Sequence, residues 1–211
     1  MSELVVGCLE MGLLSNNTYF LHRDGEYDCI LIDPAANGEH LVTKLREKGL
    51  EIKAIFLTHA HFDHMMGVEG VKKLSDAPIY GSKKDSKAFE DPELNQCGMI
   101  NKNISVKLDH ELSDGDELTI GNMKCKIIET PGHTKGGICF YFEEDKCLFS
   151  GDTLFFESYG RTDFEGGSAS DLKASLDKLF KLPDDTKVYP GHNDFTTIGH
   201  EKEYNPIVGL I

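Results

Sequence analysis

The stretch from Thr58 to His64 holds four strong metal ligands within six positions: His59, His61, Asp63 and His64. Imidazole nitrogens and carboxylate oxygens are donors that zinc and other divalent transition metals accept in proteins. Side chains two apart in an extended loop point the same way, so His59 and His61 can face one metal while Asp63 and His64 face another. The alternative is a hydrogen-bonded surface cluster, but crowded imidazoles raise one another's protonation cost. The stretch therefore predicts a metal site.

Three turns further along the chain carry more ligands in the same local setting. Each follows a strand-like run and contains glycine, namely Pro131-Gly132-His133, Gly151-Asp152 and Pro190-Gly191-His192. Glycine lets the backbone turn sharply and approach an ion closely. One such turn alone is more often an ordinary loop, but the set predicts that four strand ends converge on one site.

These ordered motifs resemble those of the metallo-β-lactamase superfamily of hydrolases. Within it, residues 160–164 and 196–206 resemble the small glyoxalase II-like branch, and the resemblance spans nearly the whole chain. The resemblance implies three ligands for each of two metals and one bridging carboxylate. The first metal would be held by His59, His61 and His133, the second by Asp63, His64 and His192, with Asp152 bridging them.

The expected ligand set has five imidazoles, two carboxylates and no thiolate, which suits zinc, iron(II) or manganese. We expect two divalent metal ions, with zinc the first choice. A metal pair about 3.5 Å apart brings the pKa of a water held between the metals from about 15.7 towards 7. The hypothesis is that this hydroxide attacks a thioester or similar acyl carbonyl, and that Asp63 both binds metal and orients the hydroxide.

The substrate is indicated less directly. Arg161 lies where glyoxalase II enzymes carry a basic residue that contacts the glutathione carboxylate, and the alternative is that it pairs with a neighbouring carboxylate. Two tyrosine positions of that family hold Asp163 and Asp194 here, and the chain stops at Ile211, where full-length glyoxalase II continues into a helical region with basic contacts. We expect a small-molecule acyl thioester, such as a hydroxyacylglutathione, in a more open pocket.

Two other functions fit parts of the pattern. An oxidoreductase similar to persulfide dioxygenases would hold a single iron(II) with a subset such as His59, His133 and Asp152, and those enzymes share the run at residues 160–164. A non-catalytic metal-binding module would have closed coordination shells. The complete second ligand set and the turn before His192 favour the hydrolase.

Length and composition limit the remaining possibilities. The chain has 211 residues, 39% of them hydrophobic, which predicts a single domain over residues 1–211. Its net charge of −14 argues against a nucleic-acid partner, since such binding needs a basic footprint. No apolar stretch reaches the roughly 18 residues needed to cross a membrane, and no basic region precedes the short apolar run at the N-terminus. We therefore expect a cytoplasmic protein; the sequence does not indicate its oligomeric state.

Several side chains receive structural interpretations. The six cysteines lack Cys-x-x-Cys spacing, so neither a disulfide framework nor a thiolate metal site is expected. Asp33 is expected to hold loops by hydrogen bonds beside the site, and Asn16 and Asn17 to form a hairpin turn. Four histidines are expected to be surface or satisfied residues: His22, His40, His110 and His200.

The elements that must position the ligands follow from hydrophobic periodicity. Strands are predicted at residues 3–9, 17–22, 28–33, 54–57, 104–108, 117–120, 123–129, 138–143, 146–150 and 187–189. Helices are predicted at residues 39–48 and 65–74, and from a cap at Ser168 to a point before Pro183. Two β-rich halves, each followed by a helix, predict an α/β (α+β) protein with sheets packed face to face. The resemblance implies the same four-layer αββα sandwich.

Overall fold

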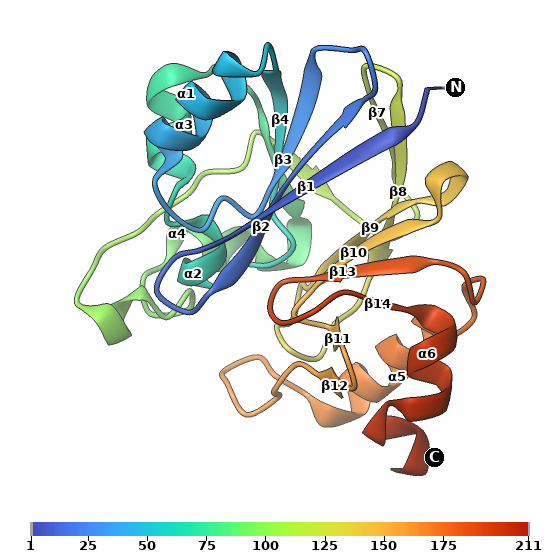
Figure 1. Cartoon of the computed structure of the whole chain (residues 1–211). Coiled ribbons are helices and arrows are strands. Elements are labelled where there is room, and N and C mark those ends of the chain that lie inside the picture. The colour runs from blue at the N-terminus through green and yellow to red at the C-terminus, as the bar shows by residue number, and fades with distance from the viewer. Residues whose placement is uncertain (1, 211) are drawn as a thin grey trace.

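The computed structural model describes residues 2–210 and contains two six-stranded sheets packed face to face, with helices on their outer sides (Figure 1). This mixed α/β arrangement confirms the predicted sandwich. The first sheet is built from the N-terminal half of the chain and the second from the C-terminal half, as the colour order of Figure 1 shows.

The first sheet is antiparallel at one edge and parallel through the rest. Its strands, in spatial order, are β1 (Leu4–Met11), β2 (Asn16–Arg23), β3 (Asp28–Ile32), β4 (Glu51–Phe56), β5 (Ile79–Ser82) and β6 (His110–Leu112). The parallel register pairs Ile32 at the end of β3 with Phe56 at the end of β4, so the loops after both strands leave the sheet together.

The second sheet is antiparallel except for one parallel pair, β10 with β13. Its strands, in spatial order, are β14 (Thr196–Thr197), β13 (Lys187–Pro190), β10 (Cys147–Gly151), β9 (Ile138–Phe142), β8 (Met123–Glu129) and β7 (Glu117–Ile120). A separate hairpin consists of β11 (Leu154–Phe155) and β12 (Ser158–Tyr159). Two antiparallel steps separate β8 from β10, so β8, β10 and β13 all run in the same direction.

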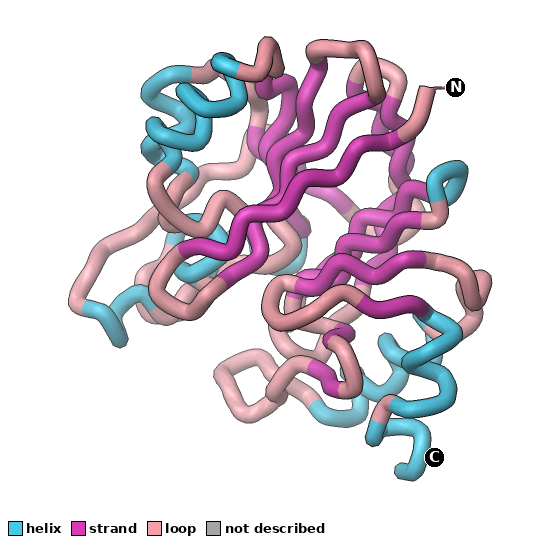
Figure 2. Tube along the Cα trace, viewed as in Figure 1, coloured by secondary structure: helices cyan, strands magenta, loops and turns pink. Residues whose placement is uncertain are grey.

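The helices flank the two sheets, as the cyan segments of Figure 2 show. The α-helices are α1 (Gly38–Glu47), α2 (Phe62–Met65), α3 (Val68–Leu74), α4 (Ser86–Glu90), α5 (Ala169–Leu179) and α6 (Ile198–Tyr204). Short 3-10 turns are η1 (Lys83–Asp85), η2 (Cys97–Ile100), η3 (Glu143–Asp145) and η4 (Pro206–Leu210). The predicted cap at Ser168 is confirmed, because its hydroxyl accepts a hydrogen bond from the Asp171 N–H at the start of α5.

Three apolar cores hold the layers together. Strand β3 contributes to two of them because successive side chains of a strand point to opposite faces. Leu31 packs towards α1 and α3, whereas Ile30 enters the core between the sheets, where Phe56 and Phe140 stack with ring centroids 4.5 Å apart. The third core lies between the second sheet and α5, with Leu176 fully buried. A strand buried on both faces explains the continuous apolar run of β3.

Three predicted elements are wrong. Residues 104–108 are irregular rather than a strand: the backbone N–H of buried Val106 donates to the carbonyl of Phe89, and the edge strand is β6. The helix predicted at residues 65–74 has the wrong start: it begins at Val68 as α3 and ends at Leu74 as predicted, after a turn at residues 66–67 that separates it from α2. The hairpin turn lies at residues 12–15, and Asn16 and Asn17 begin β2.

Within the described residues 2–210, no helix is long and apolar enough to cross a bilayer. All six cysteines are free thiols, five of them buried, which agrees with the expected absence of a disulfide framework.

Candidate metal centre

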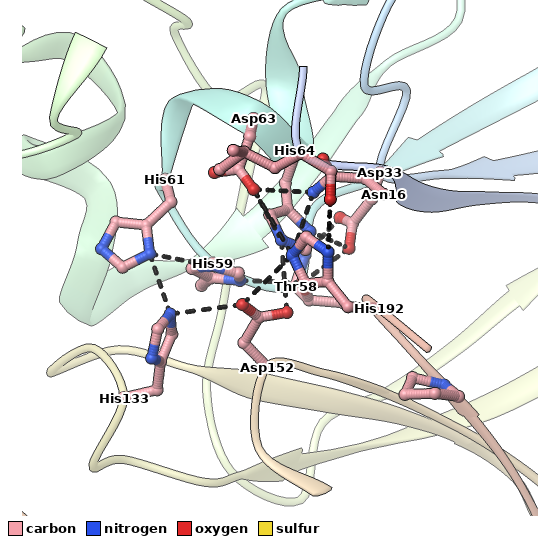
Figure 3. A network of polar contacts seen from close by, with 12 residues as sticks. Asn16, Asp33, Thr58, His59, His61, Asp63, His64, His133, Asp152 and His192 are labelled. Atoms are coloured by element: carbon pink, nitrogen blue, oxygen red, sulfur yellow. Dashed lines mark hydrogen bonds and ion pairs between the residues drawn. The ribbon is translucent and has the colours of Figure 1, made fainter. Parts of the chain in front are cut away.

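Four strand ends bring the predicted ligands to one end of the sandwich (Figure 3). The loop after β4 carries His59 to His64, and the turns after β8, β10 and β13 carry His133, Asp152 and His192. The last three turns meet because their strands run in the same direction and therefore end at the same edge of the second sheet. The predicted convergence of strand ends is confirmed.

The first group of ligand atoms is formed by His59, His61 and His133, all buried. His61 Nδ1 lies 3.1 Å from His59 Nε2 and 2.9 Å from His133 Nε2. Three imidazole nitrogens at such separations repel one another through their lone pairs unless a proton or a cation lies between them. The group therefore has the form of a cation site.

The second group is formed by Asp63, His64 and His192. Asp63 Oδ2 lies 3.6 Å from His64 Nε2 and 3.5 Å from His192 Nε2. Asp63 and His64 are buried at the start of α2, whereas the His192 side chain is 19% exposed. The two groups thus differ in composition, because only the second contains a carboxylate of its own.

Asp152 lies between the groups and contacts both. Its Oδ1 is 3.3 Å from His64 Nε2, while its Oδ2 is 3.5 Å from both His133 Nε2 and His192 Nε2. Figure 3 shows this carboxylate between His133 on one side and His192 on the other. One carboxylate can therefore serve two adjacent cations.

Two buried atoms that could ligate a metal make no hydrogen bond, although they lie 3.3 Å from each other: His64 Nε2 and Asp152 Oδ1. An unsatisfied buried polar atom costs roughly 1–3 kcal/mol, so native proteins rarely keep one without a function. These two atoms face the space where the seven ligand side chains meet. Buried ligand atoms without hydrogen bonds, in a ligand set made only of nitrogen and oxygen, fit a pair of divalent metal ions.

Asp33 fixes the loop and the second ligand group by hydrogen bonds, as predicted. Its carboxylate accepts from the Thr58 N–H at 2.9 Å and the Thr58 hydroxyl at 2.7 Å, and it lies 2.9 Å from His64 Nδ1. Asp33 can reach both because the ends of β3 and β4 are adjacent. Because Asp33 holds a proton on Nδ1, Nε2 is the His64 nitrogen that can bind a metal when it is deprotonated.

Other ligand imidazoles are oriented in the same way. His133 Nδ1 lies 2.8 Å from the carbonyl oxygen of Arg161, and His192 Nδ1 lies 3.1 Å from that of Leu14. Because a carbonyl only accepts, each Nδ1 carries the proton and each Nε2 presents its lone pair to the cluster.

The protonation preferences of the two groups differ. Burial and the neighbouring imidazoles hold the pKa of His59 far below its usual value, and burial lowers the pKa of His61 to about 3. Burial also opposes the charge of His64, but Asp152, Asp63 and Asp33 outweigh it and raise the pKa of His64 well above its usual value. Burial alone would raise the pKa of Asp152, yet the attraction of His64 lowers it to about 2. His59 and His61 are therefore neutral at physiological pH, which leaves their ring nitrogens available to a metal.

Two site residues were missed by the sequence analysis. Asn16, predicted in a turn, is fully buried, and its amide donates to Asp63 Oδ2 at 2.7 Å and lies 3.3 Å from His192 Nε2. Gln96 places its amide nitrogen 3.2 Å from His61 Nε2, on the side of the ring away from the cluster. Asparagine is common in turns and Gln96 lies outside every motif, so the sequence carried no signal for either.

A cavity of about 710 Å³ opens beside the ligands, and we call it the catalytic pocket. Its polar lining includes five of the candidate ligands, His61, Asp63, His133, Asp152 and His192. Its apolar wall is formed by Leu14, Phe62, Met99, Ile100, Phe155 and Phe164. The walls suit an apolar acyl group placed next to the polar cluster.

Arg161 lies at the rim of the catalytic pocket and already has an anionic partner. Its guanidinium contacts the Asp163 carboxylate through two hydrogen bonds of 2.6 and 2.5 Å, and it lies 4.1 Å from the ring centroid of Phe164. The structure thus shows the alternative interpretation, pairing with a neighbouring carboxylate. Its contact with a substrate stays a prediction.

The four remaining histidines of the sequence analysis lie outside the ligand groups found within residues 2–210. His22 Nδ1 lies 2.9 Å from the Arg23 carbonyl, His110 stacks on Tyr80, and His200 Nε2 lies 3.1 Å from Glu157. His40 is exposed on α1. These contacts agree with the expected surface or satisfied roles.

Comparison with known proteins yields a family match over most of the chain. The family model of the metallo-beta-lactamase superfamily matches residues 11–192. The probable metallo-hydrolase YqgX of Bacillus subtilis is 36% identical over 203 residues, covering 95% of each chain. The hydroxyacylglutathione hydrolase GloC of Haemophilus influenzae is 36% identical over 189 residues, covering 88% of this chain and 89% of GloC.

Solved structures share the fold. The BLEG-1 B3 metallo-beta-lactamase is 37% identical with a TM-score of 0.92, covering 97% of this chain and 99% of its own. TTHA1623 in a di-iron-bound form is 33% identical with a TM-score of 0.83, covering 95% and 98%. ETHE1 from Myxococcus xanthus is 29% identical with a TM-score of 0.81, covering 97% and 85%.

Proposed function

Because the chain belongs to the metallo-β-lactamase superfamily, we propose that this metallo-hydrolase domain hydrolyses an acyl thioester, such as a hydroxyacylglutathione. The observation that carries the proposal is the gathering of seven donor side chains in two groups joined by Asp152, with two buried donor atoms left without partners. Such a cluster is costly to build without a cation, because its imidazoles and carboxylates are removed from water.

The proposed ligands follow the geometry of the two groups. His59, His61 and His133 would hold one divalent metal, Asp63, His64 and His192 the other, and Asp152 would bridge them. Zinc is our first choice, with iron or manganese as alternatives, because nitrogen and oxygen donors do not discriminate among the three. The di-iron form of TTHA1623 supports iron as a candidate metal.

When bound, the metal pair supplies a hydroxide nucleophile at neutral pH and polarises the acyl carbonyl. Asp63 would accept the hydrogen bond that orients this nucleophile. Burial opposes the charge of Asp63, but His64 and the hydrogen bonds from His192 and Asn16 outweigh it and lower the Asp63 pKa, so the acceptor stays ionised at neutral pH. The Asn16 amide holds Oδ2 of this carboxylate in place. The apolar wall of the catalytic pocket would bind the acyl group and exclude water.

The thioester part of the proposal is supported by similarity to GloC and by the run at residues 160–164. The test is release of free thiol from acyl thioesters of glutathione and coenzyme A by protein loaded with zinc, iron or manganese, with a β-lactam included as a comparison substrate. We expect metal-dependent thiol release that a chelator abolishes. Absence of thiol release from every thioester by protein carrying two metals per chain would reject the proposal.

A second candidate is a persulfide dioxygenase-like oxidoreductase, because the run at residues 160–164 resembles that of such enzymes. It would need a single iron(II), held by a subset such as His59, His133 and Asp152. The complete second group, with His192 directed at Asp63 and Asp152, favours the hydrolase instead. Elemental analysis combined with oxygen uptake on glutathione persulfide separates the two: one iron per chain with oxygen uptake would support the dioxygenase.

A further inference from the structure

A second cavity, of about 340 Å³, lies next to the catalytic pocket and shares His61 with it as a lining residue. We call it the lysine pocket, after three of its lining residues, Lys84, Lys87 and Lys135. Lys84 and Lys87 come from η1 and α4, whereas Lys135 follows the ligand His133 by two positions. The side chain of His61, a candidate metal ligand, therefore borders both cavities.

In the part of the chain that the structure describes, two of the three lysines have no acidic partner. Lys84 pairs with Glu129 at 2.7 Å. Within residues 2–210, no carboxylate oxygen lies within 4.0 Å of the Nζ atom of Lys87 or Lys135. An ammonium group gains more from an added anion when no carboxylate already neutralises it. Lys87 and Lys135 are therefore available to a ligand.

The carboxylates lining the lysine pocket do not cancel this charge. Asp85 is buried, and its carboxylate accepts the Thr134 hydroxyl at 2.7 Å and the backbone N–H groups of Gly136 and Ala60. The carboxylate oxygens of Asp85 are thus occupied by hydrogen bonds inside the protein. Glu165 is exposed and forms no ion pair within the described chain, so it weakens the positive potential only from the edge.

Arg161, the one lysine or arginine that lines the catalytic pocket within residues 2–210, offers no comparable charge because its guanidinium is engaged by Asp163. The whole chain carries a net charge of −14, so its average field repels anions. Unpaired cations beside the catalytic pocket are therefore the favourable location for an anionic group of a substrate.

Building on the thioester hydrolase proposed above, we infer that the lysine pocket binds the anionic end of the substrate's thiol portion, with Lys87 and Lys135 determining specificity. The acyl group would occupy the apolar catalytic pocket, and the thiol portion would pass His61. A lysine ammonium is a compact charge that accepts a carboxylate or a phosphate. The anion can therefore be a carboxylate of glutathione or a phosphate of coenzyme A.

The test compares three thioesters that share one acyl group: S-acetylglutathione, acetyl coenzyme A and the uncharged S-acetyl-N-acetylcysteamine. The variant is the double substitution Lys87→Gln and Lys135→Gln in metal-loaded protein. We expect kcat/KM for at least one anionic thioester to fall about 10- to 100-fold, while kcat/KM for the uncharged thioester changes less than about twofold. The anionic thioester that responds identifies the source of the anion.

Two single variants serve as matched controls. Lys83→Gln removes an exposed lysine that lines neither cavity, and it should leave all three rates unchanged. Glu165→Gln removes the exposed carboxylate and should raise kcat/KM for the responding anionic thioester about twofold or more. A purely structural role of the lysines would predict neither the rise nor the dependence on substrate charge.

The inference is overturned if the double variant slows all three thioesters equally, or if the wild type shows no preference for a charged thioester. Calorimetric binding of the thioethers S-methylglutathione and S-methyl coenzyme A separates this inference from the proposed function. If no thioester is hydrolysed, the proposed function fails. The Kd for the two thioethers then decides on the lysine pocket separately. An unchanged Kd in the double variant rejects anion binding there, and a Kd raised at least tenfold supports it.

Discussion

Asp63 is the side chain in which metal binding and nucleophile orientation would coincide. It lies against His64 and His192 and receives the Asn16 amide. We expect Asp63→Ala to lower kcat about 10²- to 10⁴-fold while KM changes less than about tenfold, because the lost contacts act mainly in the transition state. Steady-state kinetics at saturating metal, with metal content measured in parallel, checks this. Wild-type turnover in a fully metallated variant would reject the role.

Asp33 contacts no substrate in the proposal but positions a ligand. An amide has one acceptor oxygen, so it cannot accept from the Thr58 N–H at Oδ1 and from the Thr58 hydroxyl and His64 Nδ1 at Oδ2 at the same time; Asp33→Asn should therefore weaken the second metal about 10- to 100-fold and the first much less. Competitive metal titration measures the two affinities. Asp28→Asn, a half-exposed aspartate at the start of β3, is the matched control. Equal weakening of both metals would contradict the assignment.

At the scale of elements, the turn after β13 brings its backbone against the ligands. A Cβ on Gly191 would lie 2.3 Å from Asp152 Oδ1 and 2.6 Å from His64 Cε1. Gly191→Ala should therefore displace these ligands and reduce the bound metal from two ions towards one without unfolding the protein.

Elemental analysis and circular dichroism together check this prediction. Gly98→Ala is the control, because the nearest atom to its added Cβ is 3.8 Å away. Two tightly bound metals in Gly191→Ala would show that the turn tolerates a side chain and that its glycine serves another purpose.

The strand ends were predictable from sequence, whereas the connections between them were less so. Runs such as β4 and β10 are apolar and end at glycine or ligand residues, which local patterns reveal. Residues 104–108 also alternate in polarity, but they pack beside the sheet through Phe89 rather than within its ladder. Alternation of polar and apolar residues indicates that one face of the segment is buried, but it does not indicate that the segment is hydrogen-bonded to an adjacent strand.

For the whole molecule, metal binding should be a large part of stability. A ligand at a thousand times its Kd stabilises the native state by about 4 kcal/mol, which for a chain of this size corresponds to roughly 8–16 °C in Tm. We expect chelation to lower Tm by about this amount, because it leaves the buried imidazoles and carboxylates without a partner. Calorimetry with and without chelator measures it.

The histidine variant His200→Ala is the control for that experiment, since His200 lies on α6 outside the ligand groups and should keep the full response to chelation. Identical melting with and without metal would contradict a structural contribution of the cluster.

The acidic character of the whole chain also makes a prediction. With a net charge of −14 and only two unpaired lysines beside the site, the protein should not bind single-stranded RNA detectably at about 150 mM salt. Fluorescence anisotropy of a labelled oligonucleotide checks this. Salt-sensitive binding with a steep slope would contradict the proposed small-molecule substrate.

The sequence by itself determined the sandwich and the seven side chains that meet at its end. These ligands are chemically distinctive, and they follow apolar strands at turns where glycine is needed, so local order was sufficient to find them. The resemblance to a known family supplied their division into two groups.

Only the tertiary structure decided which side chains support and surround those ligands. The contact of Asn16 with Asp63 and the lysine pocket beside His61 were not evident from sequence, and the pairing of Arg161 with Asp163 was only one of two interpretations there. Each depends on how segments with no distinctive motif pack against one another. Local patterns encode the direction of a strand and the need for a turn, but a polar side chain's partner is set by the long-range packing that brings it within hydrogen-bonding distance.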